Sequence, residues 1–270
     1  MKQEEQATKA GRRAHSQSLE RGLAILSSFT SVQPLLGVSE LAREVGLNRS
    51  TTHRYIATLA ALGYLQQDAP TKKYRLGPRV VDLGFSAINS MELREVAAPH
   101  LRRLSDETGC TVNMAILDGL DIVYVERCRS TQAGQREIDL NLHVGARLPA
   151  YCTSLGKVLL AWLAPEEQAA ALDRVDFSRR GPNTITSRSA LIAELDRVRA
   201  EGFAINNEEL AYGLRSIAAP ILDRDGAAAA AINLAMHSSM VSMDDLSARL
   251  SETVRRSAAD ISAHLGYRSK

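Results

Sequence analysis

The 270-residue sequence has few cysteines, few aromatic residues and no long apolar run. Its three cysteines are odd in number and lack the CxxC spacing, which argues against a disulfide framework or a zinc knuckle. The six histidines are scattered without metal-ligand spacing, so no metal or cofactor is expected. No segment approaches the roughly 18 apolar residues of a membrane span, and the first residues lack the apolar core of a secretory signal. We therefore expect a soluble, cytoplasmic protein with reduced cysteines.

Charge is nearly balanced over the whole chain but is unevenly distributed. Residues 1–80 hold 12 Lys and Arg against 6 Asp and Glu, whereas residues 81–270 hold 21 against 25. The length is comfortable for two domains, and a hydrophobic content of 45% supplies material for buried cores. A basic front attached to a mildly acidic body indicates that the front binds a polyanion.

A polar, mobile arm is expected at residues 1–15 and a winged helix-turn-helix domain at residues 16–77. In "VSELAREVGLNRSTTHRYIATLAALGYL", Gly46 ends one short amphipathic helix and Asn48 caps a second. Two short helices joined by a tight turn with glycine form a helix-turn-helix. The extended pieces of "YLQQDAPTKKYRLG" then follow as a β-wing.

Local signals also indicate the ends and inner faces of these two helices. Ser39 is the expected N-cap of the first helix, and Gly63 is expected to end the second. The apolar residues of the second helix, Ile56, Leu59 and Leu62, are expected to face inward.

The start of the second helix and the wing supply candidate DNA contacts, because the N-terminal end of a recognition helix enters the major groove. Arg can bond a guanine edge, Asn an adenine edge and Thr a thymine methyl, while wing residues contact phosphates. The candidates are Asn48, Arg49, Ser50, Thr51, Thr52, His53 and Arg54 on the helix and Lys72, Lys73 and Tyr74 on the wing. The alternative for Ser50 and Thr52 is that they cap the helix, and the alternative for His53 is a phosphate contact or packing.

The remainder is predicted to form a linker helix at residues 78–92 and an α+β domain at residues 93–270, with an antiparallel sheet flanked by helices. Asp118-Gly119 lies between two strand-like runs and predicts a hairpin. Further strands are expected in "FAINNEE", "GLRSIAAPILD" and "AAAAAINLAM". Further helices are expected at 93–108, at 154–172 with a break at Pro165, at 187–201 and at 243–266.

The stretch "RLPAYCTSLGK", residues 147–157, concentrates polar and reactive side chains ahead of an apolar run. If a helix begins near Ser154, the amides of its first turn have no internal partners and attract a carboxylate. Thr153 and Ser154 add hydroxyl donors, and Gly156 allows a ligand to approach the backbone. The pattern indicates a cradle for a small anion.

Other residues of this stretch have a functional and a structural interpretation. Arg147 is placed to clamp a carboxylate, and the alternative is an ion pair with an acid such as Glu208. Tyr151 is suited to stack on or hydrogen-bond a ligand, and the alternative for it and for Cys152 is ordinary packing. Lys157, one turn into the helix, is expected to be solvated.

An enzymatic interpretation rests on Ser154 and Lys157, which match the S-x-x-K motif of serine acyl-transferases. The Ser-Asp-Asn and Lys-Thr-Gly motifs that accompany it are absent downstream. A thiol–imidazole pair of Cys152 and His143 has no evident third group to orient it. We therefore expect a binding site and no catalytic residue, with a hydrolase or acyl-transferase carrying a DNA-binding domain as the alternative.

Six stretches resemble the IclR family of bacterial transcription regulators. "SLERGLAILSSF", "VSELAREVGLNRSTTHRYIATLAALGYL" and "KYRLGPRVVDLG" resemble its winged-helix domain. "LPAYCTSLGKVLLA", "NNEELAYGLRSIAAPI" and "AAINLA" resemble its GAF-like effector-binding domain. The motifs look most similar to those of the PcaR, PcaU and PobR-like regulators of the β-ketoadipate pathway. The effectors of that group are protocatechuate, β-ketoadipate or 4-hydroxybenzoate.

The resemblance implies a homodimer, or a dimer of dimers, on a palindromic double-stranded DNA operator. It also implies a small carboxylate effector against the central sheet, and by position it surrounds that effector with Ser154, Leu155, Asn206, Leu214, Ser216, Asn233 and Ala235. Glu208 of "NNEE" is added to this set. Glyoxylate- and pyruvate-sensing relatives carry an Asp where this chain has Asn206, and the lost charge suits a larger or more anionic ligand. Effector binding would then shift the population between two arrangements of the DNA-binding domains. The remaining alternative is a ligand-free architectural or RNA-binding winged helix.

Overall fold

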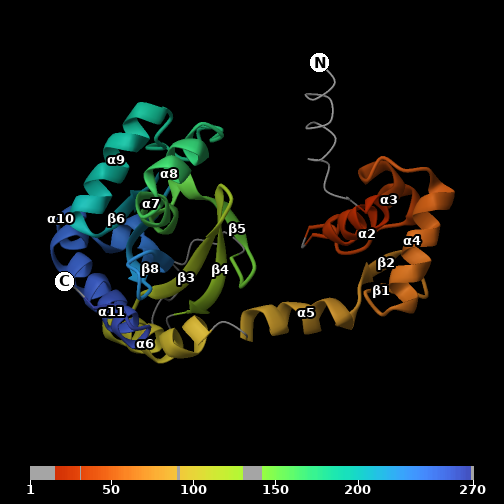
Figure 1. Ribbon diagram of the computed structural model, residues 1–270, viewed down its shortest axis with the longest axis horizontal. Helices are drawn as coiled ribbons and strands as arrows, with labels where there is room; N and C mark the ends of the chain where they lie inside the picture. Colours follow the sequence, from red (N-terminus) through yellow and green to blue (C-terminus); the bar gives the residue numbers. More distant parts are fainter. Residues whose placement is uncertain (1–15, 31, 90–91, 130–141, 269–270) are drawn as a thin grey trace, which may run out of the picture. The chain divides into compact units, whose positions relative to one another are not determined.

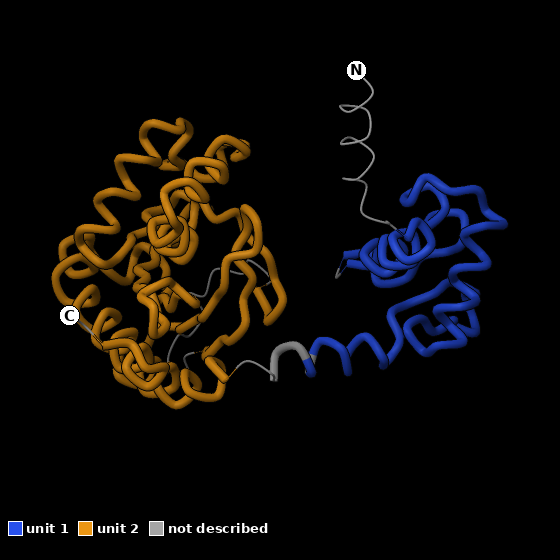
Figure 2. The backbone as a smooth tube through the Cα atoms, viewed as in Figure 1, with its two compact units in different colours: residues 1–90 blue, residues 91–270 orange. Residues whose placement is uncertain are grey.

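The computed structural model describes the whole chain apart from residues 1–15, 31, 90–91, 130–141 and 269–270. The chain divides into two compact units, residues 1–90 and residues 91–270 (Figure 2). The arm predicted at residues 1–15 lies outside the described residues. Among the helices that are described, none is long and apolar enough to cross a membrane.

The first unit is the predicted winged helix-turn-helix (Figure 1). Its core consists mainly of Ile25, Leu41, Ile56 and Leu65, which are fully or almost fully buried. Its elements are α2 (Gln17–Ser27), α3 (Val38–Glu44), α4 (Arg49–Ala61), β1 (Leu65–Gln67), β2 (Tyr74–Leu76) and α5 (Pro78–Asn89).

Most of the predicted helix ends in this unit are confirmed. The Asn48 side chain accepts a hydrogen bond from the Thr51 amide and caps α4, and Gly46 ends the preceding helix with a φ of 64°. The prediction of Ser39 as the cap of α3 is wrong. Gly37 takes that position because its amide donates to Glu40 Oε2 at 2.6 Å.

Leu62 does not face inward as predicted, because it is 55% exposed at the end of α4. Together with Leu19 and Leu23 of α2, it lines an apolar groove on the surface of the first unit. The helical periodicity therefore located the apolar residues correctly but did not distinguish the core from this second apolar face.

The second unit is built around a six-stranded antiparallel sheet in the order β5-β4-β3-β8-β7-β6. This confirms the α+β expectation, including the hairpin at Asp118-Gly119. The strands are β3 (Thr111–Asp118), β4 (Asp121–Cys128), β5 (Arg147–Pro149), β6 (Ala204–Asn207), β7 (Leu214–Leu222) and β8 (Ala228–His237). The helices are α6 (Glu92–Thr108), α7 (Ser154–Ala161), α8 (Pro165–Leu172), α9 (Arg188–Glu201), α10 (Met243–Asp245) and α11 (Ser251–His264).

Helices cover both faces of this sheet, so the unit has two apolar cores. The helices α6 and α11 pack on one face (Figure 1), where Val112, Met114 and Val125 belong to the buried cluster. On the other face, α7 packs against the central strands and α9 packs against α7. Ala115 and Tyr124 belong to that second cluster. The strands β3, β4, β6, β7 and β8 therefore contribute residues to both cores.

The pairing of β3 with β4 contains a bulge that interrupts this alternation. Met114 pairs with Glu126 and Ala115 pairs with Tyr124, so Val125 is the extra residue. A bulge shifts the phase of the strand by one residue. Tyr124 and Arg127 consequently lie on the same face of the sheet although they are an odd number of residues apart.

Candidate DNA interface and effector site

The N-terminal end of α4 presents a polar, exposed surface. Arg49, Ser50, His53 and Arg54 are exposed, and Asn48 is exposed while its side chain caps the helix. These residues occupy the first turns of the second helix of the helix-turn-helix, which is the end that reads base edges in proteins of this architecture. Arg54 also borders the apolar groove of the first unit.

Two of the predicted DNA contacts are wrong, because their side chains belong to the core. Thr52 has no exposed surface, and its hydroxyl donates to the Asn48 carbonyl within the helix. Tyr74 is 7% exposed and packs in the core of the first unit, where its backbone bridges to Leu36. Arg75, which is not among the predicted DNA contacts, takes the outward position of β2 instead.

The tip of the wing is a tight turn with cationic side chains. Lys72 is exposed and adopts a φ of 58°, and its amide donates to the Asp68 carbonyl. Lys73 is half-buried and pairs with Glu40 of α3 at 3.1 Å. Lys72 and Arg75 are therefore the wing cations that face solvent, whereas Lys73 ties the wing to α3.

In the second unit, the predicted cradle at the start of α7 is largely an internal corner of the fold. Thr153 caps α7, accepting from the Gly156 amide and donating to the Ala150 carbonyl. A Cβ on Gly156 would lie 2.2 Å from the Ala150 carbonyl oxygen, so this glycine permits packing against residues 150–152. Its predicted role in ligand approach is not what the structure shows. Ser154 is fully buried, and its hydroxyl lies 2.7 Å from that of Ser216 on β7.

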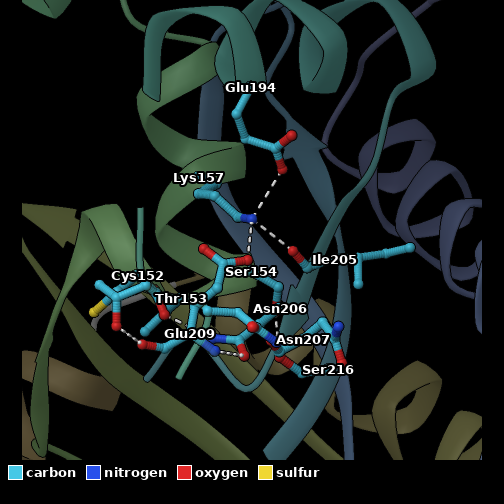
Figure 3. A network of polar contacts seen from close by, with 12 residues as sticks. Cys152, Thr153, Ser154, Lys157, Glu194, Ile205, Asn206, Asn207, Glu209 and Ser216 are labelled. Atoms are coloured by element: carbon cyan, nitrogen blue, oxygen red, sulfur yellow. Dashed lines mark hydrogen bonds and ion pairs between the residues drawn. The ribbon is translucent and has the colours of Figure 1, made fainter. Parts of the chain in front are cut away.

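Lys157 is buried, which corrects the prediction that it is solvated. Its Nζ donates to Glu194 Oε1 at 2.8 Å, Glu209 Oε1 at 2.6 Å and the Ile205 carbonyl at 2.6 Å (Figure 3). Burial raises the pKa of Glu209, although the nearby Lys157 acts in the opposite direction. Burial acts to raise the pKa of Glu194 as well, but hydrogen bonds from Arg197 and the charge of Lys157 outweigh it, and the net shift is downward.

Asn206 joins this network to the corner before α7 (Figure 3). Its amide nitrogen donates to the Cys152 carbonyl at 2.6 Å, and its Oδ1 accepts from the Glu209 amide at 3.2 Å. Both ends of the side chain are therefore used within the protein. Asn206 and Lys157 together hold α7, β6 and the segment after β6 in one arrangement.

A row of polar side chains crosses the α7-facing side of the sheet. Asn113 on β3 donates to Asn233 Oδ1 on β8 at 2.8 Å, and both are almost completely buried. Arg127 on β4 donates from Nη1 to Asn113 Oδ1 at 3.3 Å. Ser216 lies on the same face, one strand beyond β8, where it pairs with Ala235. Asn113 and Arg127 were not predicted as site residues.

The other predicted effector-site residues have varied positions. Arg147 is exposed on β5 and pairs with Asp118 at 2.7 Å and with Asp121 at 3.4 Å, so Glu208 is not its partner. Glu208, with a φ of 57°, accepts from the Gly213 amide and thus closes the turn before β7. Leu155 is buried in the α7-side core, and Leu214 is half-buried at the start of β7.

Tyr151 and Cys152 fit the packing interpretation. The Tyr151 hydroxyl donates to the Ser178 carbonyl, and its ring packs edge-to-face on Phe177. Cys152 is buried, and burial raises the pKa of its thiol to about 11. A thiol with such a pKa is a poor nucleophile near neutral pH.

The S-x-x-K motif is not assembled as a nucleophile and a base. The Lys157 ammonium is held by two carboxylates and a carbonyl, while the Ser154 hydroxyl is hydrogen-bonded to Ser216. Among the described residues, no group of three or more His, Cys, Asp or Glu is arranged to hold a metal ion.

Comparison with known proteins identifies both units. The model of the IclR helix-turn-helix domain matches residues 18–69, and the model of the C-terminal domain of bacterial IclR regulators matches residues 85–263. The chain belongs to the IclR family. It is thus an IclR-type transcriptional regulator with a DNA-binding domain and a ligand-responsive effector domain.

Individual relatives support the family without selecting a subgroup. The regulator XynR of Escherichia coli K12 is 34% identical, and the alignment covers 93% of this chain and 98% of that protein. The Pca regulon regulatory protein of Pseudomonas putida is 36% identical, with coverage of 90% and 82%. A solved IclR homolog of Microbacterium hydrocarbonoxydans, complexed with 4-hydroxybenzoate, aligns with a TM-score of 0.79 at 26% identity, covering 92% and 98%. The β-ketoadipate subgroup stays a prediction.

Proposed function

We propose that this IclR-type regulator binds a palindromic operator as a homodimer and responds to a small aromatic carboxylic acid bound against the α7-facing side of the sheet. The observation that carries the proposal is the row of buried polar side chains formed by Asn113, Asn233 and Ser216 across three strands of the sheet. Buried polar groups are costly unless they are paired or serve a ligand. These three side chains are paired within the protein, and together they form an organised polar strip on one face of the sheet that suits the polar end of a ligand.

The DNA-binding part of the proposal rests on the exposed surface of α4 and the wing. Arg49, Ser50 and His53 are proposed to face the major groove, and Lys72 and Arg75 to contact phosphates. Arg49 can donate two hydrogen bonds to one guanine, whereas Lys72 acts as a point charge. These two residues are expected to contribute differently to sequence preference.

The apolar groove of the first unit supports the proposed dimer. Leu19, Leu23, Leu62 and Leu83 line it, and each is more than half exposed in the single chain. Exposed apolar patches of this kind commonly mark protein–protein interfaces. A second copy of the same groove would cover these leucines and would place two α4 helices on one operator. A dimer of dimers is proposed to follow through the effector domains, as the family resemblance implies.

The choice of an aromatic acid draws on two relatives. The Pca regulon regulator of Pseudomonas putida is among the similar proteins, and the Microbacterium homolog was solved with 4-hydroxybenzoate. Protocatechuate, 4-hydroxybenzoate and β-ketoadipate are therefore the first ligands to test on this chain. A hydroxylated ring has apolar faces and polar ends. This suits the α7-facing side of the sheet, where alanines and asparagines lie next to each other.

The DNA-binding proposal is tested with duplexes selected from a random pool by the purified protein. Fluorescence anisotropy then compares the selected duplex with a scrambled one for the parent, Arg49→Ala and Lys72→Ala. We expect Arg49→Ala to lose about 1–3 kcal/mol of binding free energy on the selected duplex and none on the scrambled one. Lys72→Ala should weaken both duplexes alike and reduce the salt slope by about one unit.

Arg188→Ala is the matched control, because Arg188 is an exposed cation of the effector domain that pairs with Asp173. It should leave both affinities unchanged. Equal losses on both duplexes for Arg49→Ala and Lys72→Ala would refute the assigned roles. Adding each acid to the preformed complex tests the response, and a regulator of this type must show a changed DNA affinity with at least one ligand.

A further inference from the structure

Resting on the proposed contact between the wing and DNA phosphates, we propose that Asp68 is a positioning residue for DNA binding, which holds the wing tip in the conformation that presents Lys72. An acidic side chain close to a polyanion weakens binding through repulsion when it has no other role. Asp68 therefore acts on DNA affinity in two opposite directions, through its charge and through the turn that it stabilises. Because the two effects differ in sign, a substitution at Asp68 shows which one is larger.

Lys72 adopts a backbone conformation that is rare for lysine. Its φ of 58° lies in the left-handed region, where glycine and asparagine predominate because a larger side chain is crowded by the backbone. The Lys72 side chain is exposed at the tip of the wing. Residues other than glycine remain in this region only where neighbouring contacts hold them, and they are frequent at functional sites. The contacts around Lys72 therefore determine where its ammonium group lies.

Asp68 is bonded to each of the three residues that form the tip. Its Oδ2 accepts hydrogen bonds from the Thr71 amide at 3.1 Å and from the Thr71 hydroxyl at 2.5 Å. Its carbonyl oxygen accepts from the Lys72 amide at 2.9 Å, and its amide donates to the Lys73 carbonyl at 2.8 Å. The Thr71 hydroxyl in turn accepts from the Lys73 amide at 3.3 Å. The hydrogen bonds from Thr71 also lower the pKa of Asp68, so its carboxyl group is ionised at neutral pH.

The rest of the wing is held in place without the Asp68 side chain. Lys73 pairs with Glu40 of α3 at 3.1 Å. Tyr74 and Leu36 form a β-bridge with two backbone hydrogen bonds, of 3.0 and 2.8 Å. A substitution at Asp68 is therefore expected to leave the wing attached to α3 and to change only the tip. An effect on DNA binding would then report the position of Lys72.

The test uses the full chain with the selected and scrambled duplexes of the anisotropy assay, at salt concentrations from about 50 to 200 mM. Asp68→Ala removes both side-chain hydrogen bonds, and it should weaken both duplexes about three- to tenfold, as expected for one lost phosphate contact. Its salt slope should fall by as much as that of Lys72→Ala. Asp68→Asn keeps an acceptor oxygen for Thr71 and should bind at least as tightly as the parent. Thr71→Val removes the hydroxyl without a change of charge, and it should weaken both duplexes less than Asp68→Ala does.

Two controls separate the turn from the charge. Glu20 is an exposed acid of α2, so Glu20→Ala changes the charge of the first unit by the same amount as Asp68→Ala. It should leave DNA affinity unchanged or raise it slightly, because it removes only repulsion. The double variant Asp68→Ala/Lys72→Ala should bind no more weakly than Lys72→Ala, since the contact that depends on Asp68 is already lost. Circular dichroism of each variant verifies that the helices are retained.

The possible results distinguish this inference from the proposed function. If Asp68→Ala binds as tightly as the parent or more tightly, the charge effect is the larger one and the positioning role is overturned. The role is also overturned if Asp68→Asn binds as weakly as Asp68→Ala, or if the losses of Asp68→Ala and Lys72→Ala add in the double variant. In each of these cases a reduced salt slope in Lys72→Ala would still support the contact between the wing and phosphates. If Lys72→Ala leaves the slope unchanged, that part of the proposed function fails, and the role of Asp68 fails with it.

Discussion

Replacing Lys157 by methionine is the most informative single perturbation of the effector domain. The side chain is 1% exposed, and its ammonium makes three short hydrogen bonds, two of them to carboxylates. Methionine preserves most of the volume, so the change removes the charge without opening a large cavity. Glu209 would be left buried without a cation, since Glu194 keeps Arg197 as its second partner.

The expected cost follows from the burial of the partner. Removing one member of a buried ion pair typically destabilises a protein by about 3–5 kcal/mol, because the other charge stays desolvated. The Glu209 side chain is 8% exposed, and its Oε2 already has no hydrogen-bond partner among the described residues. We therefore expect Lys157→Met to lower the free energy of unfolding of the effector domain by about 3–5 kcal/mol.

The measurement uses the single tryptophan of the chain. Trp162 directly follows α7 and stacks under Arg199 at 4.6 Å, so its fluorescence reports unfolding of the effector domain alone. Urea titrations of the parent, Lys157→Met and Lys157→Met/Glu209→Gln give the coupling between the two residues. Arg188→Met, at an exposed ion pair, is the matched control and should change the free energy of unfolding by less than about 1 kcal/mol.

The pH dependence follows from the direction of the Glu209 shift. Burial raises the pKa of Glu209 in the folded state. Protonated Glu209 therefore favours the folded state, and this contribution to the free energy of unfolding is lost as the pH rises through the raised pKa. Without Lys157 this loss is larger. The difference in the free energy of unfolding between the parent and Lys157→Met should therefore increase from pH 5 to pH 8. Two results would refute this explanation. One is a free energy of unfolding that falls by less than about 1 kcal/mol in Lys157→Met, and the other is a double variant with Glu209→Gln that is no more stable than Lys157→Met.

Two further predictions concern the corner before α7. Gly156→Ala should destabilise the effector domain by about 1–3 kcal/mol in urea unfolding, since its Cβ would lie 2.2 Å from the Ala150 carbonyl oxygen. Gly84→Ala in α5 of the first unit, where an added Cβ meets nothing within 4 Å, should instead be neutral or stabilising when unfolding is followed by circular dichroism, and a stabilising Gly156→Ala would contradict the packing argument. Cys152, whose pKa burial raises to about 11, should resist iodoacetamide at pH 8 in the native protein and react in urea, as followed by peptide mass spectrometry. Native labelling of Cys152 as fast as that of half-buried Cys128 would show that the corner opens.

The parts of the fold that the sequence predicted are those that depend on local signals. Asn48 and Gly46 mark helix ends through a side-chain cap and a positive φ, and Asp118-Gly119 marks a hairpin through the same backbone freedom. Within the wing, alternation places Tyr74 and Arg75 on opposite faces of β2, and the cation is the better candidate for the exposed face. The aromatic hydroxyl of Tyr74 suits a phosphate contact by residue type, but its place on the buried face of β2 prevents that contact.

The parts that it missed depend on contacts between distant segments. Lys157 is buried because Glu194 and Glu209 come from α9 and from the segment after β6, and nothing near Lys157 in sequence indicates them. Arg127 faces α7 because β4 holds one residue more than β3 opposite it, which no periodicity of β4 alone reveals. The motif at residues 147–157 was correctly recognised as part of the family pattern, but most of its polar atoms stabilise the fold.

The bulge in β4 also bears on how this gene can change over time. Val125 is the residue without a partner, and its side chain points into the α6-side core. Losing its codon would restore a regular ladder in which Tyr124 still faces Ala115 and Arg127 still faces Asn113. An in-frame deletion there would leave the side chains on the α7-facing side of the sheet in place but would remove one core residue. An alignment of sequences that have this residue with sequences that lack it is therefore correct along β4 only when the gap is placed at the bulge.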